Sequence, residues 1–453
     1  MFLSLVFALG LGGCAWMRPD LAARVATGTT AHDLCSETFV SGQNPDQVFA
    51  ETEAPRPGLR WIAPLIRYRV DREHQEVQAS LAGAFTSRAI YRGAWGCTLV
   101  GPHDTVALDD PPPAPTAPPG ADWPFPVTAS PALQTALAHA FAENDPHAPR
   151  ATKAVLVLYR GNLVAERYAP GYGPQTPILG YSISKSVTNA LVGILVRQGK
   201  LGVDTPVRLD NGEQAKVTLE NLMRMTSGLD LDETGSGFDP SNHVMYLHPA
   251  DMAAAARKAR PLAPPGERWA YSSASVHLIA RMVRDATGGD ASGVQRFARE
   301  QLFGPLGMRH VTMEMDETGT PIGAHYMLAS ARDWARFGEL YLDDGVTPNG
   351  RRILPENWVR WSTTPTLDTD YGAGWWVNRR AQTSAKPVGD MPLMSDAPPD
   401  TFYALGNLGQ YVIVVPSKQL VIVRMGNAQT HDFDIDGANR LVADVIAALP
   451  GSS

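Results

Sequence analysis

The hydrophobic and polar positions of the chain change period several times, and each change marks a predicted element. Apolar runs rich in β-branched residues predict strands at residues 154–160 and 162–168, joined by a tight turn at Gly161 and Asn162. Apolar positions with helical spacing follow directly at residues 182–201, in a segment that ends near two glycines. Strand patterns return only near the end of the chain, at residues 401–407, 409–416 and 420–427, before a last helical pattern at residues 437–449.

The region between these strands, from about residue 205 to residue 400, is dominated by amphipathic helical patterns separated by Pro and Gly breaks. A further helical pattern at residues 132–144 precedes the first strand. The sequence therefore predicts an α+β fold. Its antiparallel sheet is built from both ends of the domain, is flanked by terminal helices and is interrupted by a large helical insertion.

A proline-rich stretch gives the clearest predicted domain boundary. Eight prolines lie between Pro111 and Pro126, and such a sequence favours an extended, semi-rigid connector because proline offers no backbone N–H. We expect a linker at residues 106–125. A small N-terminal α+β domain at residues 21–105, with strand-like patterns, would precede it, and the main domain would occupy residues 126–453.

The first twenty residues form a separate predicted unit. An apolar run too short to span a bilayer ends at Leu11, Gly12, Gly13 and Cys14, which resembles the lipobox of bacterial lipoproteins. No Lys or Arg precedes the run, and a buried N-terminal helix is the alternative interpretation. The prediction is export to the periplasm, with Cys14 lipidated and the protein anchored to the membrane through that lipid.

Cysteine usage fits the same compartment. The chain has three cysteines, so that lipidation of Cys14 would leave Cys35 and Cys97 as a pair. An oxidising compartment would allow these two to form a disulfide, whereas two buried free thiols are the alternative.

Composition excludes one class of partner. The 453 residues carry a formal net charge of −7 and are 44% hydrophobic and 19% charged, as is ordinary for globular proteins. The arginines are scattered singly and form no basic stripe along the sequence, so nucleic acid is not an expected partner. Neither a His-Glu-x-x-His motif nor a Cys/His cluster occurs, and no metal or organic cofactor is predicted.

The strongest chemical signal is the stretch "GYSISKSV" at residues 180–187. Positions three apart lie on the same face of a helix, so Ser182 and Lys185 would project together at its first turn, whereas Ser184 and Ser186 would face elsewhere. Serine needs a base to act as a nucleophile, and lysine serves as one when burial lowers its pKa. Taken alone, the stretch also fits a helix start capped by Ser182 or Ser184.

A second stretch changes the interpretation. In "PPGERWAYSSASVHL", Tyr271 lies between a Pro-Gly loop and a predicted helix. Together with Ser182 and Lys185, this order resembles the serine hydrolases related to β-lactamases and penicillin-binding proteins. The resemblance covers residues 126–453, includes strings such as "MTSGL", "SARDWARFG" and "YGAGWW", and is greatest to the esterase and 6-aminohexanoate-dimer hydrolase branch.

This resemblance implies a role for each matching residue. Ser182 would be the acylated nucleophile, Lys185 its general base, and Tyr271 the phenol that relays the proton to the leaving group. The third motif would lie at residues 404–406, where Gly406 would line the substrate and the backbone N–H groups of Ser182 and Asn407 would form the oxyanion hole. Residues 407–409, which end in Gly409, are the alternative placement.

Two departures from the family pattern bear on the substrate. Neither candidate triplet carries the Lys or His that faces a carboxylate in the penicillin-recognising relatives, and Ser273 replaces an amide-holding asparagine as the expected substrate-binding residue. The resemblance therefore implies a hydrolase of small esters or amides rather than of β-lactams. The alternatives are a non-catalytic protein that binds the cell wall and a D-amino-acid-specific peptidase.

Overall fold

The computed structural model describes residues 18–101, 123–210, 217–234, 237–379, 393–430 and 433–450. Cys14 and most of the predicted proline-rich linker lie outside these ranges. Among the helices of the described residues, none is both long enough and apolar enough to cross a membrane.

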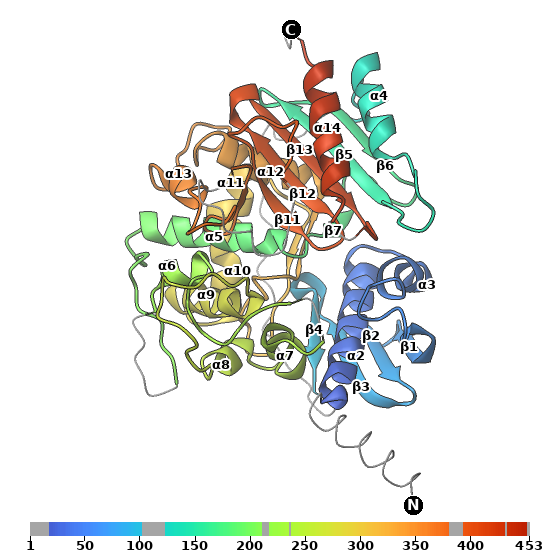
Figure 1. The fold of residues 1–453 in the computed structure, drawn as a ribbon, viewed down its shortest axis with the longest axis vertical. Coiled ribbons are helices and arrows are strands. Elements are labelled where there is room, and N and C mark those ends of the chain that lie inside the picture. Colours follow the sequence, from blue (N-terminus) through green and yellow to red (C-terminus); the bar gives the residue numbers. More distant parts are fainter. Residues whose placement is uncertain are drawn as a thin grey trace, which may run out of the picture.

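A six-stranded antiparallel sheet lies at the centre of the upper part of the molecule in Figure 1, with the strand order β10-β11-β12-β13-β5-β6. Strand β13 pairs with β5, for example Val421 with Leu158, and this pairing joins the last part of the chain to the first. The predicted α+β fold with a sheet built from both ends is confirmed. The strands are β5 (Thr152–Tyr159), β6 (Asn162–Tyr168), β10 (Trp376–Val377), β11 (Phe402–Gly406), β12 (Gln410–Val415) and β13 (Leu420–Gly426).

The hairpin between β5 and β6 turns one residue earlier than predicted. Tyr159 pairs with Asn162, so that Arg160 and Gly161 form the two-residue loop, and both have positive φ. Two-residue hairpin loops of this kind twist in the sense that antiparallel strands require, and glycine enters them at little cost.

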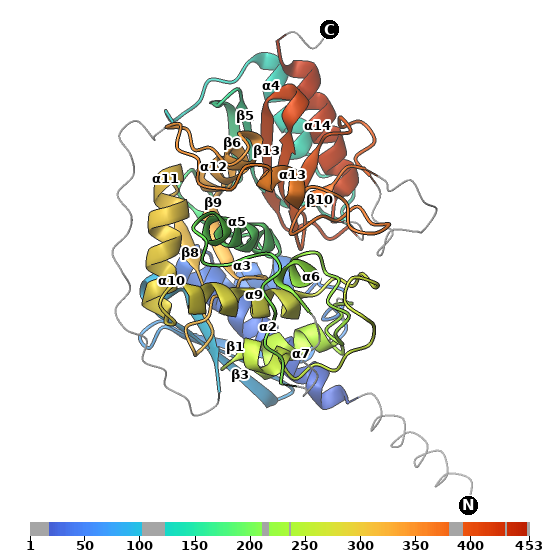
Figure 2. The same cartoon turned by 90° about the vertical axis from the view of Figure 1, so that its left-hand side faces the viewer.

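Helices cover both faces of this sheet (Figures 1 and 2). On one face lie α4 (Pro131–Ala140) and α14 (Ile435–Ala448), which pack against each other. On the other lie α5 (Ile183–Arg197) and α12 (Ala331–Leu342). Gly338 allows α12 to pack closely on β12 and β13. A Cβ at that position would lie 2.5 Å from a methyl carbon of Val421 and 2.9 Å from one of Val412.

The helices of the insertion from α6 to α10 lie below α5 in Figure 1, whereas α11 and α13 lie above it. A small sheet that the sequence pattern did not predict joins the segment before α5 to the insertion. Its strand order is β7-β9-β8, and its strands of three or four residues are too short to show a period. The strands are β7 (Pro177–Leu179), β8 (Val311–Met313) and β9 (Met327–Ser330). The helices and helical turns of this part and the following loops are α6 (Leu219–Met223), α7 (Pro240–Leu247), α8 (Met252–Ala256), α9 (Ser273–Ala286), α10 (Ala291–Ala298), η5 (Arg299–Phe303), α11 (Gly304–Leu306), α13 (Trp358–Ser362) and η6 (Pro416–Lys418).

The N-terminal segment folds into a four-stranded antiparallel sheet, β1-β2-β3-β4, covered by one long helix, α2. Residues of this segment belong to the same hydrophobic core as the central sheet. The segment is therefore packed into the body of the protein and is not held only by a linker. Its elements are α2 (Pro19–Cys35), η1 (Ser36–Val40), α3 (Pro45–Val48), η2 (Phe49–Glu53), η3 (Ala63–Leu65), β1 (Ile66–Asp71), β2 (Glu76–Leu81), β3 (Ala84–Tyr91), η4 (Gly93–Trp95) and β4 (Cys97–Val100).

Buried polar contacts join α2 to the insertion. Glu314 accepts hydrogen bonds from the Ser36 hydroxyl (2.9 Å) and from the backbone N–H of Cys97 (2.8 Å), and one of its oxygens lies 2.8 Å from Nε2 of His32. The His32 ring stacks on that of Tyr326, with centroids 3.7 Å apart. Because burial raises the pKa of Glu314, these partners are needed to keep a carboxyl group at this depth.

A disulfide fixes the same region. Cys35, the last residue of α2, is bonded to Cys97, the first residue of β4, with a Cα–Cα distance of 6.0 Å and a sequence separation of 62 residues. A crosslink of this span restricts the unfolded chain and so stabilises the fold.

Replacing both cysteines, Cys35→Ala with Cys97→Ala, is expected to lower the free energy of unfolding by about 2 to 4 kcal/mol, because the unfolded chain regains the entropy of the open loop. Urea denaturation would measure the change, and reduction of the wild-type protein should reproduce it. A double variant as stable as the oxidised wild type would contradict this expectation.

Candidate active site

Ser182 and Lys185 meet at the start of α5. Lys185 Nζ donates a hydrogen bond to Ser182 Oγ over 2.8 Å. Ser182 occupies the N-cap position, yet its hydroxyl makes no capping bond to the helix backbone. The preceding residue, Tyr181, has a φ of 47°, which turns the chain sharply from β7 into the helix. Ser182 is partly exposed, whereas the Lys185 side chain is buried.

Lys185 is held by two further oxygens. Its Nζ also donates to the Ser273 hydroxyl at 2.9 Å and to the carbonyl oxygen of Ala324 at 3.1 Å. Burial lowers the pKa of Lys185 to about 8, against the opposing effect of the Glu233 carboxylate. A buried ammonium with a pKa near 8 loses its proton easily, and its neutral form can accept one from a hydroxyl.

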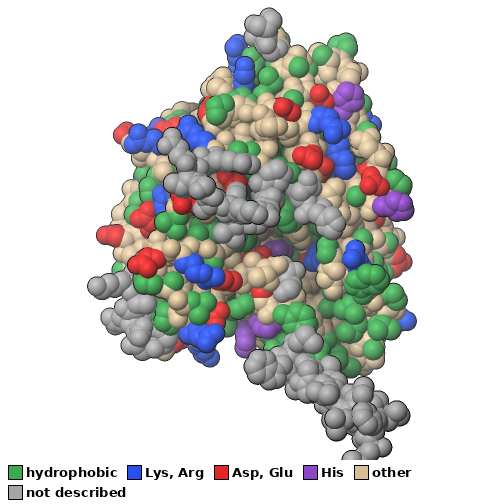
Figure 3. Space-filling view, viewed as in Figure 1, with side chains coloured by type: hydrophobic (Ala, Val, Ile, Leu, Met, Phe, Trp, Pro, Cys, Tyr) green, Lys and Arg blue, Asp and Glu red, His purple; other side chains and the backbone are tan. Residues whose placement is uncertain are grey.

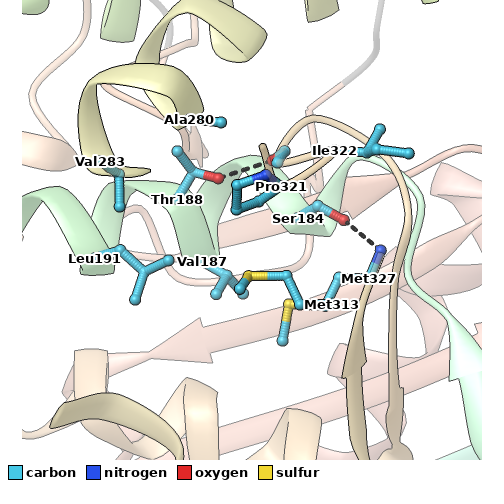
Figure 4. Close-up of a pocket in the computed structure, with 11 residues that line it drawn as sticks. Ser184, Val187, Thr188, Leu191, Ala280, Val283, Met313, Pro321, Ile322 and Met327 are labelled. Atoms are coloured by element: carbon cyan, nitrogen blue, oxygen red, sulfur yellow. Dashed lines mark hydrogen bonds between the residues drawn. The ribbon is translucent and has the colours of Figure 1, made fainter. Parts of the chain in front are cut away.

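The two neighbouring serines point away from Lys185, as the helical spacing predicts. The Ser184 hydroxyl donates to the carbonyl of Tyr181 at 2.7 Å and accepts from the N–H of Met327 at 3.2 Å, and Figure 4 shows it directed at Met327. The Ser186 hydroxyl donates to the carbonyl of Gly374 at 2.6 Å. Both hydroxyls fasten α5 to its surroundings, and Ser182 is the serine of this stretch that lies beside Lys185.

Tyr271 lies just before α9 and closes the site from the insertion side. Lys185 Nζ is 4.7 Å from the centroid of its ring. Burial raises the pKa of Tyr271 well above its usual value, with further upward contributions from Tyr371 and Glu233 and a smaller opposing one from a hydrogen bond with Ser182. The phenol is therefore protonated at neutral pH and able to donate.

Gly406 and Gly409, the glycines of the two predicted placements of the third motif, lie in different surroundings. Gly406 ends β11, and a Cβ on it would overlap the carbonyl oxygen of Gly180, two residues before Ser182. Gly409 lies in the turn after β11 with a φ of 79°, against Arg424 and the carbonyl of Phe433. Residues 404–406 thus run beside the Ser182 segment. Asn407 follows Gly406 directly and is partly exposed.

Ser273 takes a different position from the one expected of a substrate-binding residue. It is fully buried, its hydroxyl accepts from Lys185, and its backbone N–H donates to Glu233 Oε2 at 2.8 Å. Ser273 therefore links the Lys185 amine to the Glu233 carboxylate. No sequence pattern pointed to Glu233 or to the Ala324 carbonyl, because neither belongs to a motif of fixed spacing.

Aromatic side chains form one wall of the site. The Tyr271 ring lies 5.9 Å from Trp376 and 5.8 Å from Tyr371, and Trp269 lies 6.3 Å from Tyr271, all measured between centroids. Tyr371 and Trp376 are the first and last residues of the string "YGAGWW". Trp269, Tyr371 and Trp376 are buried, and they support the partly exposed ring of Tyr271 from behind.

Two buried histidines near Lys185 add no charge. Burial, and then the positive charge of Lys185, lower the pKa values of His277 and His325 to about 3, so both are neutral at neutral pH. Across the described ranges, no group of three or more His, Cys, Asp or Glu side chains is arranged to hold a metal ion.

This fold and this arrangement of side chains define the class of protein. The family model described as Beta-lactamase matches residues 140–447, which is more than half of the chain. The chain therefore belongs to the Beta-lactamase family, a family of serine hydrolases whose relatives below include ester and amide hydrolases.

Individual relatives refine the comparison. The 6-aminohexanoate-dimer hydrolase of Paenarthrobacter ureafaciens is 28% identical over 226 residues, which cover 46% of this chain and 56% of that protein. The chain thus matches little more than half the length of this curated relative. A putative 6-aminohexanoate-dimer hydrolase from Bacillus anthracis superposes with a TM-score of 0.54 at 24% identity, covering 66% of this chain and 81% of that one. A family VIII carboxylesterase gives a TM-score of 0.54 at 14% identity, covering 71% and 98%. At these identities, the two structures show a shared fold.

Substituting Gly406→Ala is expected to destabilise the protein by about 1 to 3 kcal/mol, because the added methyl group overlaps the Gly180 carbonyl and forces β11 away from the Ser182 segment. Urea denaturation would measure the loss. Gly173→Ala is the matched control, since its Cβ would meet only the Thr176 hydroxyl at 4.0 Å, and its effect should stay within about 0.5 kcal/mol. Equal stability of the two variants would contradict the close approach of β11.

Proposed function

We propose that this protein is a serine hydrolase that cleaves an ester or a small amide through an acyl-enzyme on Ser182. The observation that carries the proposal is the 2.8 Å hydrogen bond between Ser182 Oγ and the buried amine of Lys185, whose pKa is lowered to about 8. At neutral to mildly alkaline pH a fraction of Lys185 is neutral, and it then accepts the proton of Ser182 as the hydroxyl attacks.

The reaction divides into two steps. In the first, Ser182 Oγ bonds to the substrate carbonyl carbon and its proton passes to Lys185. As the bond to the leaving alcohol or amine breaks, Tyr271 donates its proton to that group and takes one back from Lys185. In the second, water gives a proton to Lys185 as it attacks the acyl carbon, and Ser182 Oγ regains a proton from Lys185 as the acyl bond breaks. The backbone N–H groups of Ser182 and Asn407 would stabilise the oxyanion in both steps, because they lie at a helix start and at the end of β11.

Two features support an ester or small amide as the substrate class. Ala404 stands where the penicillin-recognising relatives carry a cation, so that position offers no partner to a substrate carboxylate. The partly exposed ring of Tyr271, backed by the buried Trp269, Tyr371 and Trp376, would pack against an acyl or alcohol group. The similarity to an enzyme named for the hydrolysis of a 6-aminohexanoate dimer adds linear amides to the candidates.

An exported, membrane-anchored protein remains our proposal for localisation. The Cys35–Cys97 disulfide supports it, because structural disulfides persist in oxidising compartments such as the periplasm. The lipobox-like segment ending at Cys14 supports it independently.

Ser182→Ala should abolish both covalent labelling by a fluorophosphonate probe and hydrolysis of short-chain p-nitrophenyl esters, because the variant has no hydroxyl to acylate. Mass spectrometry of the labelled peptide would identify the modified residue. Ser184→Ala, which removes a hydroxyl bonded only within the protein, should retain labelling at Ser182. Failure of the wild-type protein to label at Ser182 or to cleave any ester or linear amide in a substrate panel would refute the proposal and favour a binding role.

The rate of acylation should rise with pH through an inflection near 8, because Lys185 must be neutral to take the proton and its pKa is about 8. Single-turnover labelling or ester hydrolysis across a pH series would measure this limb. Lys185→Arg, which stays protonated, should be inactive throughout the series, and Lys185→Ala should likewise lose turnover. An active Lys185→Ala variant with the same inflection would remove Lys185 from the role of base.

A further inference from the structure

Three large apolar side chains are exposed on the N-terminal sheet. Trp61 is 79% exposed, Leu65 52% and Phe85 36%. Exposed apolar side chains are common singly, but a tryptophan with most of its surface in water is rare on a monomeric protein unless another surface meets it. The apolar side chains in the lower right of Figure 3 gather over this part of the fold.

These side chains share one end of the sheet. The backbone N–H of Ala82, in the turn between β2 and β3, donates to the carbonyl of Leu65 at 2.9 Å. Leu81 pairs with Ala84 across that turn, so Phe85 follows it directly. Trp61 precedes Leu65 by four residues in a chain of tight turns. We call the surface formed by Trp61, Leu65 and residues 82–85 the hairpin-end patch.

The start of α2 lies at the same end. Thr27 of α2 contacts Ser87 of β3, with the two hydroxyls 2.8 Å apart. Farther along, Cys35 is bonded to Cys97, which pairs with Tyr91 of β3. Helix and strand therefore run in the same direction, and the N-terminus of α2 at Pro19 lies near the beginning of β3, beside the hairpin-end patch.

Two exposed arginines, Arg60 and Arg67, lie in this part of the chain. Acidic side chains of this part of the fold are paired with other arginines: Asp20 with Arg18, Asp71 with Arg69, and Glu76 with Arg88. The Arg60 guanidinium lies 4.9 Å from the Trp61 ring centroid. Exposed Arg67 donates to the backbone carbonyls of Pro64 and Ile66. Indole rings beside arginines are typical of protein surfaces that rest at the headgroup level of a membrane.

We propose that the hairpin-end patch docks on a phospholipid surface with anionic headgroups. The sequence points to a membrane as the occupant, because the segment before α2 carries the apolar run and Cys14. Helix α2 begins only a few residues after Cys14, at the same end of the sheet as the patch. Whatever brings that segment to a bilayer brings the patch there too. Trp61, Leu65 and Phe85 then enter the interface while Arg60 and Arg67 face the phosphates. The choice of a membrane as the occupant rests on the proposed localisation, whereas the site at Ser182 plays no part in this inference.

A site-specific probe separates docking of the patch from attachment of the segment before α2. The full chain with Cys14→Ser, which removes the acyl acceptor, would carry a polarity-sensitive fluorophore on Ala84→Cys in the patch. Its matched control is Ala138→Cys, also at an exposed alanine, in helix α4, which lies at the opposite end of the molecule in Figure 1. Both proteins are mixed with vesicles of phosphatidylethanolamine and phosphatidylglycerol. We expect a shift to shorter wavelength and quenching by brominated lipid at position 84 and neither change at position 138.

Substitutions then test which side chains act. Trp61→Ala, Leu65→Ala and Phe85→Ala together should weaken vesicle binding at least tenfold. Arg60→Gln and Arg67→Gln should each weaken it by about fivefold, an effect lost on phosphatidylcholine vesicles or at high salt. All these side chains are exposed, so the unfolding midpoint of each variant should match that of its parent.

Three results would overturn the proposal. In one, vesicles bind the protein but leave the probe at position 84 unchanged, so that the segment before α2 acts alone. In another, the triple variant binds as tightly as its parent. In the last, the protein forms a dimer without lipid that the triple variant cannot form, so that a second copy covers the patch. None of these results depends on the activity proposed for Ser182.

Discussion

The burial of one ammonium group governs how this protein is assembled. A lysine side chain that is only 3% exposed loses its hydration and must find other partners for its amine. The three oxygens that Lys185 meets come from separate parts of the chain: Ser182 before α5, Ser273 at the start of α9, and Ala324 before β9. The site therefore exists only when the central sheet, the insertion and the small sheet have all converged on α5. The same burial that makes this convergence necessary lowers the pKa of Lys185 into the range where the amine can act as a base.

The N-terminal segment takes part in that convergence, although it lies before the residues matched by the family model. Asp33 of α2 accepts a hydrogen bond from the Tyr326 hydroxyl at 2.6 Å and forms an ion pair with Arg56 at 2.8 Å, and Arg56 also lies 3.4 Å from the Tyr181 hydroxyl. Burial by itself disfavours the charge of Asp33, but Arg56 and Tyr326 hold the pKa of Asp33 below its usual value. The network thus ties α2 to the residue before Ser182 and to the loop whose carbonyl binds Lys185. Since a buried charge without its partner is strongly destabilising, the segment and the main body should fold as one unit.

Much of this arrangement follows from the sequence because it rests on short-range patterns. The predicted strand at residues 154–160 is β5 with shifted ends, and the helix predicted from residue 182 is α5. The spacing of Ser182 and Lys185 fixed their contact, since a helical turn brings positions three apart together. Glu233, Ser273 and Ala324 could not be assigned to Lys185 in this way, because only the tertiary fold brings them there. For the same reason the N-terminal residues were predicted as a small domain before a linker, with no indication that Asp33 and His32 would be buried against Tyr326.

The polar groups around Lys185 lie deeper in the protein than the side chains that would face a ligand. The groups that we propose to move the proton are held by buried contacts: three oxygens surround the Lys185 amine, and the Tyr271 ring stacks on Trp376. The backbone of β11 approaches the Ser182 segment through Gly406, and this contact requires no particular side chain at Ala404, which is itself buried. A cation at position 404 is therefore not needed for the geometry of Ser182 and Lys185, and under the proposed function the alanine there would change which ligand charge the site accepts. The proposed acyl transfer and the recognition of a substrate could thus vary independently on this fold, because the first would depend on buried polar contacts and the second on the side chains that face the ligand.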